Sequence, residues 1–451
     1  MIRSLARMAA LGCALTAATY ADEPKARPPS PEAKGEVYEA KSADGLAYQY
    51  FVPKDYDKQK GTNLVFILHG SNLDRRWGFA NHPAGEFCAQ DIVVSPDGTR
   101  ANGSGTFNFM QADKDTSRLH ALHLELRKVF NIKETYLYGH SQGSFFAQFY
   151  AGQYPDFVSG VVGQASGMWI GTTLSKKHHH IAIALMHGTA DPVVPYGQSL
   201  GAIIAYQKAD YPNCRLRSLI GWNHWPDWNQ AQQQLWYCVG TASKDTVRAE
   251  AAFDALLRVQ DGADVVARYL VARRIVEETF CTPEHKEKAR DVIARVDKAA
   301  AAHVAALDKA LKDKNAWKLE TAPAWIGHSQ RFLREYQSVP ACEAFRKTQE
   351  DRVRQHLEEA QRAWQEYEKF REKDPQRAFA EGIDLVTKAF LADGYVNADF
   401  LAALKAMKDD AKKLKIPATT LKLYDKAIPP YEQALKKGDD EYEKVQKAVG
   451  A

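Results

Sequence analysis

The sequence has almost no excess charge of either sign. Its 60 Lys and Arg residues stand against 56 Asp and Glu residues, which gives a formal net charge of +4 over 451 residues. Because the basic and acidic residues nearly balance, the composition gives no sign of the basic surface that binds nucleic acid. This argues against DNA binding. Beyond residue 21, no segment approaches the roughly 20 uninterrupted apolar residues of a membrane-spanning helix. We therefore expect no nucleic-acid partner and no membrane span.

Glycine is scarce in the second half of the chain, where only 6 of the 28 glycines follow Thr241. Turns and close backbone approaches therefore concentrate before that residue. The same second half is densely charged, with 38 of the 60 basic residues and 36 of the 56 acidic ones. Because the chain is about three times a typical domain length, this break predicts two domains, over residues 36–241 and 242–451.

The first 21 residues have the pattern of a signal peptide. Arg3 and Arg7 precede the uncharged stretch Met8–Tyr20, which is too short for a permanent membrane helix. The Pro-rich residues 22–35 predict an exposed linker. We predict export to the periplasm or the medium. Residues Ala10–Cys13 resemble a bacterial lipoprotein cleavage box, which leaves lipidation as an alternative.

Cysteine is also scarce, with six in the chain and five after the predicted signal peptide. Disulfides persist in an export compartment. Cys214 and Cys238 bracket one loop, and Cys281 and Cys342 lie together in the second domain, so we predict these two pairs. Cys88 is then left as a free thiol. The alternative is that all five cysteines are buried thiols.

Short apolar runs alternate with helical patterns from residue 36 onward. The predicted strands cover residues 36–40, 47–52, 63–68, 91–94, 135–138, 158–162, 181–186 and 215–220, and the predicted helices include 118–130 and 145–150. Near-continuous apolar runs are typical of strands that are covered on both faces. The pattern predicts a doubly wound, mostly parallel α/β sheet.

The segment Tyr136–Ser144 combines an apolar strand, a Gly-x-Ser-x-Gly motif and the start of a helix. This context is that of a nucleophile elbow. Gly139 and Gly143 have no Cβ atom, so the strand and the helix can approach closely while Ser141 is exposed on a sharp turn. We predict Ser141 as a nucleophile; the alternative is an ordinary capping serine.

Two further residues complete a catalytic triad in the order Ser, Asp, His. Asp191 follows the predicted strand 181–186, and His224 follows the next predicted strand. His224 is predicted to be the base, and Asp191 to orient its imidazole. Asp227 is the competing acid, but its place before a helical pattern predicts an N-cap instead.

Backbone amides and aromatic side chains extend the predicted site. The N–H groups of Ser71 and Gln142 are predicted to form the oxyanion hole. Trp77, Trp222 and Trp225 lie near the catalytic residues in sequence and are predicted to contact substrate, with core packing as the alternative.

The remaining histidines are given structural roles. His69 ends a predicted strand and is expected to buttress the site, whereas His140 is expected to point away from the position of the base. His178–His180 stand beside two lysines and predict a solvated loop, because adjacent side chains on a strand cannot all face one metal ion. No metal or organic cofactor is implied.

Five segments together resemble the α/β-hydrolases grouped as polyhydroxybutyrate depolymerase-like and feruloyl-type esterases. These are Leu68-His69-Gly70, Ser95–Thr99, Gly139–Gly143, His187–Tyr196 and His224-Trp225-Pro226. The resemblance covers about residues 36–241. It implies a serine hydrolase of carboxylic esters, with phenolic, polysaccharide-linked or polyester substrates. A serine peptidase of the same fold and a non-catalytic envelope or polysaccharide-binding scaffold are the alternatives.

Beyond Thr241 the sequence predicts an all-helical domain. Thr282-Pro283 is typical of an N-cap followed by the first helical residue, and further helices are predicted over 352–372, 379–391, 400–414 and 421–435. This part holds no catalytic motif, so its predicted partner is a protein or the cell envelope. Residues 22–241 alone are expected to retain the turnover of a small ester.

Overall fold

The computed structural model describes residues 25–80, 89–219, 221–259, 264–278, 281–312, 398–429 and 431–433, with short stretches between 329 and 382. The predicted signal peptide, Cys88 and the predicted helix 352–372 lie outside the described residues, as do parts of the predicted helices 379–391 and 421–435.

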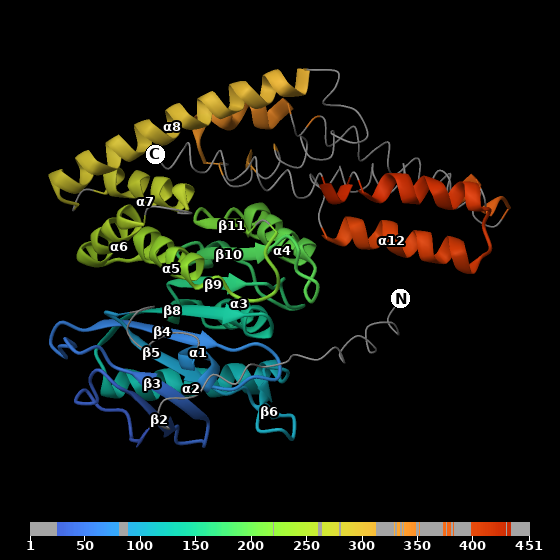
Figure 1. Cartoon of the computed structure of the whole chain (residues 1–451). Helices are drawn as coiled ribbons and strands as arrows, with labels where there is room; N and C mark the ends of the chain where they lie inside the picture. Colours follow the sequence, from blue (N-terminus) through green and yellow to red (C-terminus); the bar gives the residue numbers. More distant parts are fainter. Residues whose placement is uncertain are drawn as a thin grey trace.

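A nine-stranded sheet forms the centre of the molecule, in the order β1-β2-β3-β5-β4-β8-β9-β10-β11 (Figure 1). Its strands are β1 (Lys25–Ala26), β2 (Val37–Lys41), β3 (Ala47–Phe51), β4 (Thr62–Leu68), β5 (Ile92–Pro96), β8 (Ile132–His140), β9 (Gly160–Gln164), β10 (Ala182–Gly188) and β11 (Cys214–Leu219). The strands from β5 to β11 in this order are parallel, and β3 pairs antiparallel with both β2 and β5. The predicted doubly wound, mostly parallel sheet is confirmed.

Helices cover both faces of this sheet. The first face carries α2 (Ala112–Val129), α3 (Gln142–Gln153) and α4 (Tyr196–Lys208), and the second carries α1 (Arg76–Ala80) and α5 (Trp228–Ala242). Successive residues of β4 alternate between the two cores: Phe66 packs with the first set of helices and Val65 with the second. All seven residues of β4 are buried. Burial on both faces explains the continuous apolar run in the sequence.

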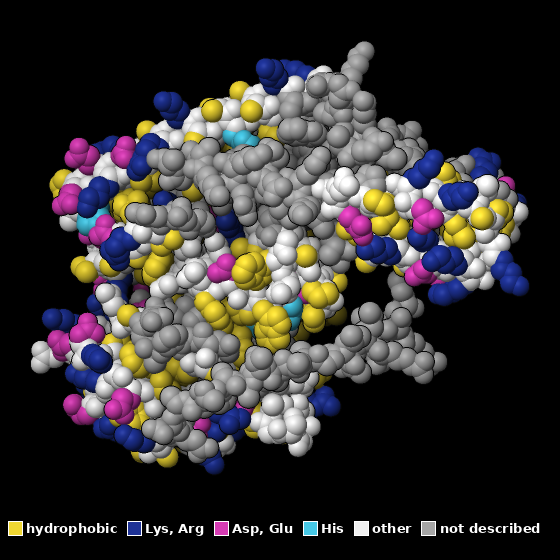
Figure 2. Space-filling model, in the orientation of Figure 1, with side chains coloured by type: hydrophobic (Ala, Val, Ile, Leu, Met, Phe, Trp, Pro, Cys, Tyr) yellow, Lys and Arg dark blue, Asp and Glu magenta, His cyan; other side chains and the backbone are white. Residues whose placement is uncertain are grey.

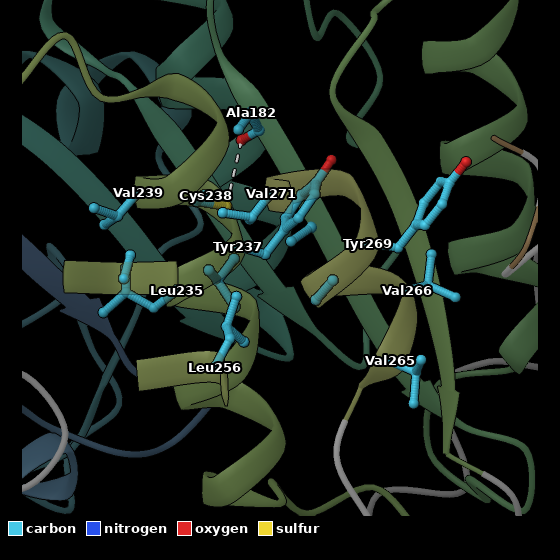
Figure 3. Packing of buried hydrophobic residues seen from close by; sticks show 14 of the residues in the cluster. Ala182, Leu235, Tyr237, Cys238, Val239, Leu256, Val265, Val266, Tyr269 and Val271 are labelled. Carbon is cyan, nitrogen blue, oxygen red and sulfur yellow. Dashed lines mark hydrogen bonds between the residues drawn. The ribbon is translucent and has the colours of Figure 1, made fainter. Parts of the chain in front are cut away.

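Three more helices stack outward from α5: α6 (Thr246–Arg258), α7 (Val265–Glu277) and α8 (Pro283–Lys312). Figure 3 shows Leu235 and Val239 of α5 packed with Leu256 of α6 and Val271 of α7. This hydrophobic cluster extends from strands of the sheet as far as Phe345. The predicted boundary at Thr241 therefore falls within one continuous core.

Helix α8 begins at Pro283, as the Thr282-Pro283 pattern predicted. Thr282 caps the helix, because its Oγ1 accepts the N–H of His285 at 3.3 Å. Farther along, α12 (Ala398–Lys413) and a helix over 418–429 share a small core that includes Leu404 and Tyr424. Figure 1 shows this pair beyond α4. No helix in the described ranges combines the length and the hydropathy needed to cross a bilayer.

The described part of the predicted linker, residues 25–35, is largely exposed or partly exposed and contacts the sheet at several points. Lys25–Ala26 pairs with β2 as an edge strand, and Ala33 is completely buried. The Tyr50 hydroxyl also donates to the Pro28 carbonyl at 2.9 Å. Proline is compatible with such an edge position, because no neighbouring strand needs its missing N–H. Part of the predicted linker is therefore attached to the edge of the sheet.

The predicted disulfides are absent from the described residues. Cys214, Cys238, Cys281 and Cys342 are all buried thiols. Cys214 belongs to the hydrophobic cluster on one face of the sheet and Cys238 to the cluster on the other, so the sheet lies between them. The Cys238 thiol instead contacts the carbonyl of Val161 and that of Ala182. Figure 3 shows the contact with Ala182. For these four cysteines, the open alternative of buried thiols is the one observed.

Candidate active site

Ser141 occupies a strained turn between β8 and α3. Its φ of 51° and ψ of −122° lie where residues with a side chain rarely occur. A Cβ atom on Gly139 would lie 2.4 Å from the Gly143 carbonyl oxygen, and one on Gly143 would lie 2.2 Å from that of Leu68. Both glycines are therefore required for the close approach that the sequence predicted.

Asp191 and His224 meet at the carboxyl ends of β10 and β11. Asp191 Oδ2 accepts a hydrogen bond from His224 Nδ1 at 2.8 Å, and both residues are buried. The other carboxylate oxygen accepts the N–H groups of Val193 at 2.8 Å and Val194 at 3.0 Å. The structure thus brings together the predicted acid and base and fixes the carboxylate from both sides.

The surroundings keep the Asp191 carboxylate ionised. Burial raises the pKa of Asp191, but hydrogen bonds from His187 and His224 outweigh it and hold the pKa well below its ordinary value. His187 Nε2 lies 3.0 Å from Asp191 Oδ2. An ionised carboxylate at Nδ1 selects the imidazole tautomer of His224 whose Nε2 is basic.

Asp227, the competing acid, is a helix cap. It precedes α5, and its Oδ1 accepts the N–H of Gln230 at 3.2 Å. This confirms the predicted N-cap.

The loop after β4 lies against Ser141. A Cβ atom on Gly70 would come within 3.3 Å of the Ser141 Cβ, which places the following residue, Ser71, beside the elbow. His69 Nδ1 donates to the Gly70 carbonyl at 2.7 Å, and its Nε2 accepts the Gly98 N–H at 3.1 Å. Burial lowers the pKa of His69 to about 4, so the ring is neutral at pH 7 and buttresses this loop as expected.

The three predicted substrate-binding tryptophans divide into two groups. Trp222 and Trp225 are 41% and 46% exposed, and the indole N–H of Trp222 donates to the Trp225 carbonyl at 2.8 Å. Trp77 is only 7% exposed and stacks on His140 at 5.2 Å, so it packs the core and cannot contact substrate directly. The prediction for Trp77 is wrong. Figure 2 shows hydrophobic side chains gathered near the middle of the face that it draws, with a histidine among them.

His140 contacts the loop of His224, the predicted base, and sequence reasoning missed this contact. Its Nε2–H donates to the His224 carbonyl at 3.0 Å, and its ring lies between Trp77 and Trp225, 5.2 and 5.5 Å away. Burial lowers its pKa to about 3, which keeps the imidazole neutral. The expectation that His140 points away from the base is wrong, because the loop of His224 folds back over the elbow.

The three adjacent histidines are separately held. His178 is buried rather than solvated, His179 Nε2 donates to the Ala209 carbonyl at 2.8 Å, and His180 Nε2 contacts the Pro155 carbonyl at 3.0 Å. The solvated-loop prediction is therefore wrong for His178. Within the described residues, no three His, Cys, Asp or Glu side chains gather in an arrangement able to hold a metal ion.

Comparisons with known proteins identify the fold. The family described as "alpha/beta hydrolase fold" matches residues 113–192, which include Ser141 and Asp191. A comparison with curated proteins gives no match.

Solved structures to which this chain is similar include esterases. Est1E from Butyrivibrio proteoclasticus with ferulic acid bound is 16% identical, and the match covers 43% of this chain and 96% of that one with a TM-score of 0.33. A Bacillus cereus carboxylesterase is 18% identical over 43% of this chain and 93% of that one, with a TM-score of 0.36. A feruloyl esterase module from Clostridium thermocellum complexed with sinapinate is 15% identical over 47% and 90%, with a TM-score of 0.35.

The fold follows from the sheet order and from the matched segment. β8, the elbow and α3 follow one another as they do in α/β-hydrolases, and the acid and the histidine follow the next strands in the order of that fold. The chain is therefore an α/β-hydrolase-fold protein.

Proposed function

We propose that this protein is a serine hydrolase that cleaves carboxylic esters through an acyl-enzyme. The observation that carries the proposal is the 2.8 Å hydrogen bond from His224 Nδ1 to the buried Asp191 carboxylate, formed at the edge of the sheet where Ser141 occupies its strained turn. A serine hydroxyl is a weak nucleophile until a correctly oriented base removes its proton.

The proposed reaction has two steps, acylation and deacylation of Ser141. Ser141 Oγ attacks the ester carbonyl carbon while His224 Nε2 takes the hydroxyl proton, and the negative oxygen is held by the N–H groups of Ser71 and Gln142. The C–O bond to the alcohol breaks as His224 returns the proton to that alcohol. Water next attacks the acyl-enzyme, its proton passes through His224 to Ser141 Oγ, and the carboxylic acid leaves.

The exposed rings of Trp222 and Trp225 favour an ester with an aromatic group. They flank His224 in sequence and present apolar surface beside a catalytic group. We therefore propose phenolic esters, free or linked to a polysaccharide, as the substrates to test first, with polyesters second. Export rests on the pattern of residues 1–21 and stays a prediction.

The decisive experiment replaces the nucleophile. Ser141→Ala is expected to lower the turnover of p-nitrophenyl acetate by a factor on the order of 10⁶, because no other group forms the acyl-enzyme. Covalent labelling by a fluorophosphonate is expected to disappear as well. Near-normal turnover by a folded Ser141→Ala variant would falsify the proposal, and hydrolysis of peptides in preference to aryl, acetyl and feruloyl esters would favour the peptidase alternative.

A further inference from the structure

A short segment of chain links the two halves of the proposed oxyanion hole. Residues 107–109 include β7 (Phe107–Asn108), which forms a small two-stranded sheet with β6 (Arg100–Ala101). The Phe107 N–H donates to the Leu73 carbonyl at 2.7 Å, which joins this segment to the loop of Ser71. The Phe109 N–H donates to Gln142 Oε1 at 2.8 Å, which joins it to the start of α3.

The Asn108 side chain makes two hydrogen bonds with Asn72 in the Ser71 loop. It accepts the N–H of Asn72 at 3.1 Å and donates to the Asn72 side-chain oxygen at 3.2 Å. Asn72 has a φ of 58°, a backbone conformation that asparagine tolerates better than most residues. The Asn108 side chain therefore holds the residue next to Ser71 in an unusual conformation.

The segment has little freedom to shift. Asn108 and Phe109 are both buried, and a Cβ atom on Gly98 would lie 2.5 Å from the Asn108 carbonyl. The Phe109 ring stacks on Phe146 of α3 at 4.8 Å and lies 4.7 Å from the His69 ring. Residues 107–109 are thus packed against both elements that supply the proposed amides.

We propose that Asn108 and Phe109 brace the oxyanion hole by fixing the separation of the Ser71 and Gln142 amides. This inference rests on the proposed function. Oxyanion donors act only when they lie about 2.7–3.1 Å from the developing charge, and a misplacement of about 1 Å costs about 100-fold in rate. Asn108 is accordingly a positioning residue, which acts on the reaction through Asn72 and Ser71.

The test removes the contact of this segment with Asn72 in one variant and its contact with Gln142 in another. Asn108→Ala deletes both side-chain hydrogen bonds to Asn72, and Gln142→Met deletes the acceptor for the Phe109 N–H while the backbone amide at position 142 remains. Each change is expected to lower kcat by about 10- to 100-fold and to leave KM within about 3-fold, because the hole binds the transition state rather than the substrate. In the double variant the fold-decrease in kcat is expected to be smaller than the product of the fold-decreases in the two single variants, because both changes release the same segment.

The matched control is Asn102→Ala. Asn102 lies on the exposed part of the β6–β7 loop and also donates to the Asn72 side-chain oxygen, at 2.8 Å. Its removal leaves the Asn108 contacts and the Gln142 contact in place. We expect kcat within about 3-fold of the unchanged protein.

A transition-state analogue separates positioning from general loss of structure. An arylboronic acid forms a tetrahedral adduct on a catalytic serine, with one oxygen in the hole. Its inhibition constant is expected to rise in the same proportion as kcat/KM falls, while the inhibition constant of the alcohol product stays constant.

The outcomes distinguish this inference from the proposed function. If Asn108→Ala and Gln142→Met fold normally by circular dichroism and keep their kcat, while Ser141→Ala is inactive, the brace is wrong and the hydrolase proposal stands. If Asn108→Ala does not fold, Gln142→Met decides the matter by the same measurements. Turnover that survives Ser141→Ala overturns the proposed function itself.

Discussion

At the scale of single residues, two aspartates near His224 have different surroundings. Asp191 is buried and binds His224 and His187 through one oxygen, whereas Asp227 caps α5. Sequence proximity would favour Asp227, which stands three residues from the histidine. The hydrogen bonds favour Asp191, and the difference can be measured.

Asp191→Asn is expected to leave the fold intact and to lower kcat by about 10⁴-fold, because the amide stabilises the wrong imidazole tautomer. Asp227→Asn is the matched control: asparagine caps helices almost as well as aspartate, so kcat is expected to stay within about 3-fold and stability within about 0.5 kcal/mol. Ester kinetics and urea unfolding of both variants check this. The opposite pattern of kcat values would move the triad acid to Asp227.

At the scale of elements, α7 is joined to the sheet by a buried ion pair. Arg215 of β11 and Asp264, the N-cap of α7, lie 2.6 Å apart, with side chains 3% and 1% exposed. Asp264 also accepts hydrogen bonds from Gln234 at 2.8 Å and from the Ala267 N–H at 3.0 Å. Burial raises the pKa of Asp264, but Arg215 and Arg217 outweigh it and lower the pKa well below its ordinary value. Docking of this helix therefore depends on the carboxylate.

Asp264→Ala is expected to destabilise the protein by about 3–5 kcal/mol, because it leaves a buried arginine without its counter-charge. Asp245→Ala is the control: Asp245 caps α6 in the same way but is a partly exposed partner of Lys133, so its loss is expected to cost about 1 kcal/mol. Urea unfolding measures both. Equal losses would show that the ion pair adds nothing beyond the cap.

At the scale of the whole molecule, three buried histidines make stability depend on pH. Burial lowers the pKa of His69 to about 4 and those of His123 and His140 to about 3, whereas an unfolded histidine titrates near 6.5. Unfolding therefore takes up protons between about pH 4 and 6.5, and the free energy of unfolding falls as the pH falls through this range. Asp91, whose pKa burial raises to about 6, opposes part of the effect.

The net expectation from these four groups is a free energy of unfolding lower by about 4 kcal/mol at pH 5 than at pH 7, measured by urea titration. His123→Gln removes one of the three titrations and is expected to reduce the pH dependence. A free energy that is constant from pH 7 to pH 5 would contradict the assignment of neutral, buried rings.

The continuous core also changes the expectation for a fragment that ends at Thr241. Apolar side chains of α6 and α7 that pack on α5 include Phe253, Leu256, Val271 and Ile275. Each buried side chain of this size contributes about 1.5–3 kcal/mol. Their sum is comparable with the whole stability of a domain, about 5–15 kcal/mol.

We therefore expect residues 25–241 to be unfolded in isolation and residues 25–348 to fold and turn over p-nitrophenyl acetate as the full chain does. Circular dichroism and ester kinetics on the two fragments check this. If the shorter fragment folds and is active, the boundary predicted from composition is the correct one.

The sequence alone was sufficient for features that depend on local order. The strands were predicted because apolar runs and turns are local signals, and the Ser141 turn because its glycines and its strand–helix context are contiguous. The acid and the histidine could be chosen because parallel strands end at one edge of a sheet, which brings Asp191 and His224 together.

Only the tertiary structure decided which surfaces face each other. Alternation along the strands places Cys214 and Cys238 on opposite sides of the sheet, which no count of cysteines reveals. Trp77 and Trp225 are both tryptophans near the site in sequence, yet one is buried against His140 and the other is exposed. Burial depends on what the rest of the chain packs against, and for that reason the substrate-facing side chains and the extent of the core follow from the fold rather than from any single motif.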